Sequence, residues 1–142
     1  MKALIDTCVI VDVLQKREPF YRDAMDIVLA VSNRRFIGFL TAKSITDVYY
    51  ILRRSIHNEE EVRKLLRVLF TLFDVKDTFS TDCQLAIGSP MKDYEDAIMV
   101  QTAIRIGADC IVTRNVKDYR AVALPVFSPE KFLEKLAENQ NN

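Results

Sequence analysis

Short apolar segments alternate with amphipathic helical patterns along nearly the whole chain, and this alternation limits the possible folds more than any other feature. Lys2–Ile5 and Phe36–Leu40 have the length and composition of buried strands. Residues 109–113 form a third such segment, and residues 122–127 predict a weaker strand, which contains Pro125 and therefore belongs at or near a sheet edge. Strands that alternate with helices indicate an α/β sandwich around a largely parallel sheet.

Helical periodicity fills the intervals between these strands. We expect helices to begin near Thr7, Pro19, Ser44, Glu59, Ser80, Tyr94 and Ser128. The helix from Glu59 has the most regular apolar stripe, and Val75 after it lies in a further short strand. Ligands of parallel sheets bind beyond the carboxyl ends of the strands, so we expect the functional site there.

Length and composition exclude several classes of protein. The chain has 142 residues, 49% of them hydrophobic, and a formal net charge of +0, which predicts one domain over residues 1–137 and a polar tail over 138–142. No stretch approaches the roughly 20 apolar residues of a membrane span. The opening apolar segment is interrupted by Asp6, too soon for a secretory signal peptide. Three scattered cysteines without a Cys-x-x-Cys pair favour reduced thiols and a cytoplasmic location.

The residue types available for chemistry are mainly carboxylates. A single histidine, His57, makes a His-rich zinc site or a catalytic triad improbable. Three glycines leave no Gly-rich phosphate-binding loop, which argues against nucleotide-binding loops of the known kinds. A catalytic function for this chain therefore has to depend on Asp and Glu.

Several acids occupy positions that a parallel sheet would bring together. Asp6 directly follows the first strand, and Asp47, Asp93 and Asp96 lie near predicted helix starts. Carboxylates that converge in one cleft repel one another, and a bound cation relieves that repulsion. Oxygen ligands without His or Cys select a hard ion such as Mg²⁺ or Mn²⁺, which can promote phosphodiester hydrolysis.

Each acid also has a purely structural interpretation. Asp6 is a possible N-cap of the helix that follows it. Ser44 and Asp47 have the spacing of a capping box, and Asp93 and Asp96 suit the dipole of the helix that they begin. No single spacing decides between these interpretations, and only the joint pattern across separate elements favours a site.

The ordered set of motifs resembles the PIN-domain ribonucleases, a group that includes the VapC-like toxins of toxin–antitoxin pairs. The matching pieces are Leu4-Ile5-Asp6-Thr7, Ser44-Ile45-Thr46-Asp47, Asp93-Tyr94-Glu95-Asp96-Ala97 and Ile111-Val112-Thr113-Arg114-Asn115, with Asp118-Tyr119 close behind. The order, the spacing and the chain length all fit, so the resemblance covers nearly the whole chain.

This resemblance implies a three-layer α/β/α sandwich with a short, largely parallel central sheet, and a site that hydrolyses RNA with Mg²⁺ or Mn²⁺. At the matching positions, Asp6, Asp47 and Asp96 are the implied catalytic acids. Asp6 and Asp96 are the implied metal ligands, with Asp93 as their auxiliary. Asp47 stands where the family commonly has Glu, and its shorter side chain puts the metal in reach only through water.

The segment after the strand at 110–112 departs from the family pattern. Asn115 stands where many members have a further Asp, and its uncharged oxygen weakens any second metal site. Asp118 is either an acid that compensates for this change or a loop and capping residue. Thr113 is expected to form hydrogen bonds within the site.

Substrate and partner predictions rest on weaker signals. Lys43, Arg114 and Lys117 lie beside the expected site and are candidate RNA-phosphate contacts, with solvated surface charges as the alternative. The resemblance implies a homodimer and, for a toxin, a small antitoxin protein. Tyr50 lies off the main apolar stripe of its helix, which also indicates a partner surface.

The leading hypothesis is a metal-dependent endoribonuclease, with the toxin of a toxin–antitoxin pair as its more specific form. The alternative is a degenerate, non-catalytic PIN-like module that binds RNA or a protein partner, and Asp47 and Asn115 are the residues that favour it. A phospho-accepting receiver domain needs an adjacent acidic pair early in the chain, whereas Asp6 stands alone.

Overall fold

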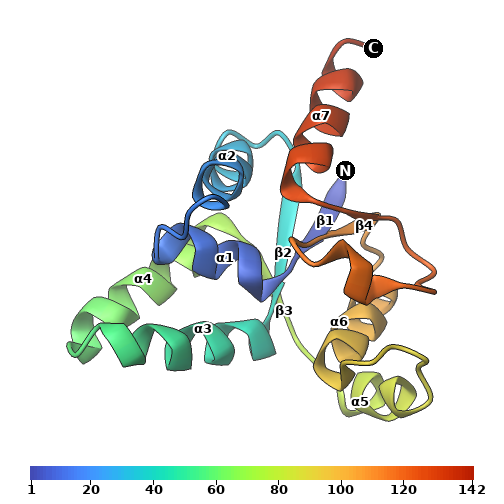
Figure 1. Cartoon of the computed structure of the whole chain (residues 1–142), viewed down its shortest axis with the longest axis horizontal. Coiled ribbons are helices and arrows are strands. Elements are labelled where there is room, and N and C mark those ends of the chain that lie inside the picture. The colour runs from blue at the N-terminus through green and yellow to red at the C-terminus, as the bar shows by residue number, and fades with distance from the viewer.

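Five parallel strands form the central sheet of the computed structural model, which describes residues 1–142 (Figure 1). The strands are β1 (Lys2–Ile5), β2 (Ile37–Thr41), β3 (Asp74–Lys76), β4 (Cys110–Val112) and β5 (Val126–Phe127). Their order is β3-β2-β1-β4-β5, and every neighbouring pair is parallel. β5 therefore lies at an edge, as Pro125 predicts, because proline cannot donate a ladder hydrogen bond.

Helices fill the connections, as the periodicity predicts. They are α1 (Thr7–Leu14), α2 (Tyr21–Ser32), α3 (Ala42–Ser55), α4 (Glu59–Leu72), α5 (Ser80–Ile87), α6 (Tyr94–Arg105), the 3₁₀ helix η1 (Val116–Tyr119) and α7 (Pro129–Gln140). None of them is both long enough and apolar enough to cross a bilayer.

Side chains alternate across β1 and define three layers. Ala3 and Ile5 face a core made with α1, α2, α3, α4 and α7. Leu4 faces the opposite way, into a second core with Val100 and Ala103 of α6. α5 packs on α6 outside this second core (Figure 1). The predicted α/β/α sandwich with a parallel sheet is confirmed.

Two helix boundaries differ from the sequence expectation. α3 begins at Ala42, and the hydroxyl of Thr41 accepts a hydrogen bond from the Ser44 amide at 3.0 Å. The capping-box interpretation of Ser44 and Asp47 is therefore wrong: Asp47 lies in the second turn of α3 and its carboxylate serves no cap.

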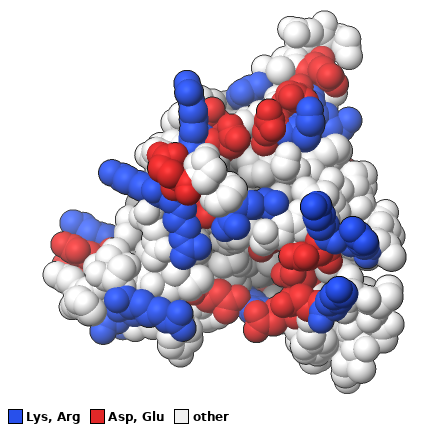
Figure 2. Space-filling model, viewed as in Figure 1, with Lys and Arg blue, Asp and Glu red and all other residues white.

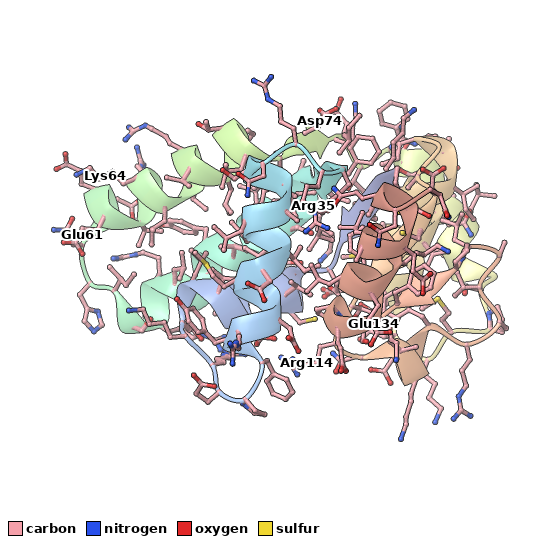
Figure 3. The ribbon with its side chains drawn as sticks, turned by 90° about the horizontal axis from the view of Figure 1, so that it is seen from above. Arg35, Glu61, Lys64, Asp74, Arg114 and Glu134 are labelled. Atoms are coloured by element: carbon pink, nitrogen blue, oxygen red, sulfur yellow. The ribbon has the colours of Figure 1, made fainter.

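The last helix is also longer than expected. α7 continues to Gln140, through residues predicted to form a polar tail. α2 and α7 lie side by side (Figure 3), and Phe132 and Leu136 of α7 are buried in the core that they share. Arg35 donates to the side chain of Gln140 at 3.2 Å, and this bond ties down the final turn.

The direction of chain progression reverses at β1. From β1 the chain adds β2 and then β3 toward one edge of the sheet, and it later returns to add β4 and β5 on the other side. Such a reversal separates the loops that follow neighbouring strands and opens a crevice at their carboxyl ends. Asp6, Thr41 and Thr113, which follow or end the three central strands, meet at this crevice.

Candidate functional site

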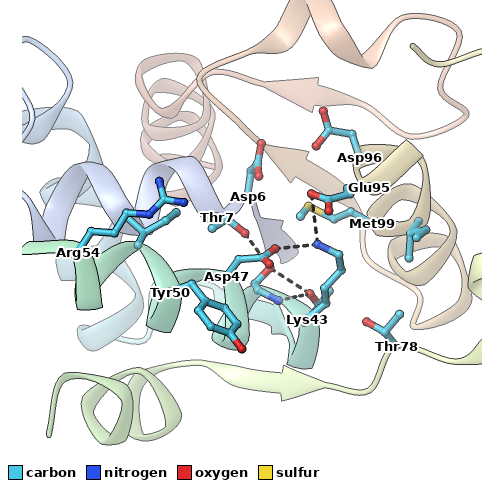
Figure 4. A pocket seen from close by; sticks show the side chains of 14 residues that line it. Asp6, Thr7, Lys43, Asp47, Tyr50, Arg54, Thr78, Glu95, Asp96 and Met99 are labelled. Atoms are coloured by element: carbon cyan, nitrogen blue, oxygen red, sulfur yellow. Dashed lines mark hydrogen bonds and ion pairs between the residues drawn. The ribbon is translucent and has the colours of Figure 1, made fainter. Parts of the chain in front are cut away.

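A cleft of about 370 Å³ lies at the carboxyl ends of β1 and β2, between α3 and α6. Its walls include Asp6, Asp47 and Asp96, the three acids predicted to be catalytic (Figure 4). They come from the end of β1, the second turn of α3 and the first turn of α6. The parallel sheet thus brings together residues that are 90 positions apart in the sequence.

Asp6 is held by hydrogen bonds to one of its two carboxylate oxygens. Thr113 Oγ1 donates to Asp6 Oδ2 at 2.7 Å, and the Tyr119 hydroxyl donates to the same oxygen at 3.2 Å. No protein group donates to Oδ1, and the side chain caps nothing although Asp6 occupies the N-cap position of α1. The carboxylate is 7% exposed, so it is fixed in orientation and keeps one oxygen available. Asp6 is thus the N-cap residue of α1 by position, but its side chain accepts hydrogen bonds from Thr113 and Tyr119 instead of capping the helix.

Asp96 points toward Asp6 across the cleft (Figure 4). Burial, and then the negative charges of Asp6, Asp93 and Asp118, raise the pKa of the Asp96 carboxyl to about 6, against a smaller lowering effect of the nearby Tyr119 hydroxyl. The carboxylates around Asp96 therefore carry more negative charge than the neighbouring positive side chains neutralise.

Asp93 and Asp118 flank this centre from a second cavity of about 510 Å³. Asp93 caps α6, because its Oδ1 accepts a hydrogen bond from the Asp96 amide at 2.9 Å. Asp93 therefore has a structural role at the start of α6, where it orients the first turn of the helix that carries Asp96. The cavity is also lined by Lys92, Lys117 and Arg120, none of which is in an ion pair.

Lys43 bridges the two walls of the cleft. Its ammonium nitrogen lies 2.7 Å from Asp47 Oδ2 on α3 and 3.4 Å from Glu95 Oε2 on α6 (Figure 4). Burial lowers the pKa of Lys43, but the bonds to Asp47 and Glu95 outweigh that effect and raise it overall. Asp47 therefore reaches the cleft with its charge already paired.

The turn after β4 orders the remaining predicted residues. Thr113 is fully buried, and its hydroxyl accepts from the Asn115 amide at 3.0 Å while it donates to Asp6. The Asn115 side chain is exposed and lines neither cavity. Cys8 lies 3.7 Å from Thr113 Oγ1, and burial and the charge of Asp6 raise the pKa of its thiol to about 12, so it is no nucleophile at neutral pH.

Arg114 lies outside the cleft. It makes two hydrogen bonds to the buried carboxylate of Asp12, at 2.8 and 3.1 Å, and its guanidinium stacks 4.3 Å from the ring centroid of Phe20. This places it beside the loop that leads into α2 (Figure 3). The contact holds the turn that carries Thr113 against α1.

Two site residues were not identified from the sequence as functional. Tyr119 follows Asp118 in one of the PIN-like motifs, and Glu95 lies between Asp93 and Asp96 in another; the sequence indicated no function for either residue. Tyr119 is 4% exposed and reaches Asp6 across 113 positions, a contact that no local pattern indicates. The position of Glu95 directly before Asp96 could have identified it as a second residue at the cleft, since both residues lie in the first turn of α6.

The donor set fits a hard divalent cation that keeps part of its water shell. No three His, Cys, Asp or Glu side chains lie close enough to form a complete metal cage. Mg²⁺ commonly uses only one or two carboxylates, together with waters and substrate phosphate. The free Oδ1 of Asp6, the raised pKa of Asp96 and the red-lined hollow in the space-filling view all match such an ion (Figure 2).

Comparisons with known proteins identify the same fold. A family model described as PIN domain matches residues 2–117. No curated protein matches the chain by sequence. A toxin–antitoxin complex from Klebsiella pneumoniae is similar in structure, with 24% identity, a TM-score of 0.65, and coverage of 89% of this chain and 97% of that one.

Two further solved structures are similar. VapBC-1 from nontypeable Haemophilus influenzae has 16% identity and a TM-score of 0.67, over 92% of this chain and 99% of that one. VapC20 of Mycobacterium tuberculosis, described as a sarcin–ricin loop cleaving toxin, has 9% identity and a TM-score of 0.61, over 77% of this chain and 86% of that one. At these identities the likeness concerns the fold.

Proposed function

We propose that this chain, which belongs to the PIN-domain family, is a metal-dependent endoribonuclease that hydrolyses RNA phosphodiester bonds. The observation that carries the proposal is the convergence of Asp6 and Asp96, where burial and neighbouring charges raise the pKa of Asp96 to about 6. Because no nearby positive group neutralises these carboxylates, they favour the binding of a cation. A hard cation beside a polar cleft can promote hydrolysis of a phosphate ester.

The roles of the chain's own residues follow from their contacts. Asp6 and Asp96 would hold Mg²⁺ or Mn²⁺, and Asp93 and Asp118 would add negative charge around it. Such an ion, when bound, activates water and stabilises the charge that builds on the phosphodiester. Thr113 and Tyr119 orient Asp6 by occupying its Oδ2, which leaves Oδ1 directed to the ligand.

Asp47 and the nearby cations serve the substrate side of the cleft. Lys43 neutralises the charge of Asp47, so this wall of the cleft repels a phosphate less than an unpaired carboxylate would. Lys117 lies in the neighbouring cavity beside Asp118 and is free to contact the phosphate backbone. Arg114 acts as a positioning residue, through its bonds to Asp12.

The toxin of a toxin–antitoxin pair is the more specific form of this proposal. It is supported by the similar structures, which include toxin–antitoxin complexes and a toxin described as cleaving the sarcin–ricin loop. An antitoxin protein and a second copy of the chain are the partners proposed with it. Exposed apolar side chains outside the cleft, such as Phe70 and Ile87 at 58% and 75% exposure, offer surface for such contacts.

Cleavage of a mixed pool of structured and single-stranded RNA tests the proposal. The purified wild type is compared with Asp6→Asn and Asp96→Asn in Mn²⁺, in Mg²⁺ and in EDTA, and Asp26→Asn on an exposed face of α2 is the matched control. We expect wild type and the control to cut in either metal, and neither site variant to cut. Equal cutting by all four proteins would show that the cleavage does not depend on Asp6 or Asp96 and would refute the assignment of the activity to this site.

A non-catalytic module is the second candidate. The Lys43–Asp47 ion pair favours this candidate, because the paired Asp47 carboxylate is not free to bind a metal ion with Asp6 and Asp96. Asn115, whose side chain is exposed and uncharged, points the same way. Binding of Mn²⁺ and RNA by folded wild type, without turnover of any RNA in the pool, would support this second function.

A further inference from the structure

One face of α3 extends the cleft away from the acidic centre. Asp47, Tyr50, Ile51 and Arg54 recur at intervals of three and four residues, so they form a single stripe along the helix. All four line the cleft, with Asp47 nearest to Asp6 and with Tyr50 and Arg54 farther along the same wall (Figure 4). The function assigned to Asp6 and Asp96 leaves Tyr50 and Arg54 unused.

Tyr50 is an aromatic side chain left open to the cleft. Its neighbour Tyr49 is partly buried against the core, and its hydroxyl donates to Glu59 at 3.0 Å, which accounts for it structurally. Tyr50 is 67% exposed, its hydroxyl has no hydrogen-bond partner, and its only aromatic contact is an edge contact with Tyr49 at 5.4 Å. A ring that projects so far into solvent beside a polar cleft has a free face for stacking.

Arg54, one helical turn after Tyr50, adds a free cation to the same wall of the cleft. Arg53, one position earlier, is paired with Glu59 at 3.3 Å, whereas Arg54 is exposed and in no ion pair. Lys43, the other cation of the cleft wall, is engaged by Asp47 and Glu95. The α3 wall therefore combines an open aromatic face with an unpaired guanidinium, the two groups that bind a base and a phosphate.

We propose that Tyr50 and Arg54 form a subsite for one unpaired nucleotide of single-stranded RNA, with the base stacked on Tyr50 and the adjoining phosphate bound by Arg54. The subsite deepens the proposed function and rests on it, because the strand would continue from here to the centre at Asp6 and Asp96. Bases in an A-form duplex are already stacked and paired, so duplex RNA cannot use Tyr50. Most residues that line the cleft are polar, which favours a nucleotide over an apolar helix of a protein partner.

The chain contains no tryptophan, which permits a direct test of stacking. Tyr50→Trp introduces a single indole fluorophore at the subsite, and Phe70→Trp, on exposed α4 outside the cleft, is the matched control. The probe is a twelve-nucleotide single-stranded oligoadenylate in EDTA, where the proposed cleavage cannot proceed. We expect this strand to quench the indole emission of the Tyr50→Trp variant, a duplex of the same length to leave it unquenched, and the Phe70→Trp control to show no change with either.

Affinities from fluorescence anisotropy separate stacking from charge. We expect Tyr50→Ala to weaken binding about 5- to 20-fold, with Tyr50→Phe near wild type, because stacking needs the ring and not the hydroxyl. The slope of log K against log salt concentration is negative, and we expect Arg54→Ala to reduce its magnitude by about 0.7, the value of one phosphate contact on a single strand. Phe70→Ala and Arg67→Ala, on α4, are the controls and should bind like wild type.

The outcomes distinguish this subsite from the nuclease activity. Equal affinity of Tyr50→Ala and wild type, or the absence of quenching, would overturn the subsite and assign the ring to a protein contact, whatever the cleavage assay shows. Quenching and weakened binding without any Mn²⁺-dependent cleavage would support the subsite and overturn the nuclease proposal alone.

Discussion

Replacement of Asp96 by Asn should make the metal-free protein more stable at neutral and alkaline pH. Burial, Asp6 and Asp93 raise the pKa of this carboxyl from its ordinary value of 3.8 to about 6. The folded protein therefore binds a proton at Asp96 more tightly than the unfolded chain does, and ionisation of Asp96 in the folded state is unfavourable. An amide of nearly the same shape removes the charge and, with it, this penalty.

The size and the pH window follow from the same shift. Its full value corresponds to roughly 3 kcal/mol. Because water in the cleft screens the acids, we expect a gain of about 1–2 kcal/mol at pH 8, or roughly 3–8 °C in Tm. Since the folded pKa is the higher one, wild type gains stability as the pH falls through about 6 toward 3.8. The advantage of Asp96→Asn should therefore shrink below pH 6 and vanish near pH 4.

Thermal and urea unfolding in EDTA at a series of pH values measure this difference. Asp26→Asn, an exposed change of the same chemistry, is the control and should follow wild type at every pH. Addition of Mn²⁺ should reverse the order, because the ion stabilises the wild-type acids and not the amide variant. A variant no more stable than wild type at pH 8, or a gain that persists at pH 4, would refute the argument that uncompensated charge is concentrated at Asp96.

Three further outcomes are expected. Arg114→Ala should destabilise the fold by about 3–5 kcal/mol in urea unfolding, because it leaves the 1%-exposed carboxylate of Asp12 buried without its partner; a loss under about 1 kcal/mol would contradict this. Gly38→Ala should cost about 1–3 kcal/mol, because its Cβ would lie 2.8 Å from the Phe73 ring, and unchanged stability in the same assay would show that the ring moves aside. Mn²⁺ should raise the Tm of wild type and EDTA should reverse the rise, whereas Asp6→Asn should show neither change; an equal rise in both proteins would place the ion elsewhere.

Local patterns were sufficient to predict the elements of the fold. The apolar run at Lys2–Ile5 and the helical stripe from Glu59 each depend on residues within a few positions of one another, and the structure has β1 and α4 at those places. A parallel sheet also aligns the carboxyl ends of its strands, so the expected meeting of Asp6 with Asp96 follows from topology. The sequence by itself thus determined the fold class and the gathering of Asp6 and Asp96 at the carboxyl ends of the strands.

Only the tertiary structure decided which side chains meet. Asp6 and Tyr119 are 113 positions apart, and Asp12 and Arg114 are 102 apart, so no periodicity relates them. The packing of α1 against the turn after β4 determined the partner of Arg114, so that a candidate RNA contact forms an ion pair with the buried carboxylate of Asp12. Periodicity specifies the face on which a side chain lies, because it is a local property of the backbone. The partner of that side chain depends on how distant elements pack, and packing is a property of the whole chain.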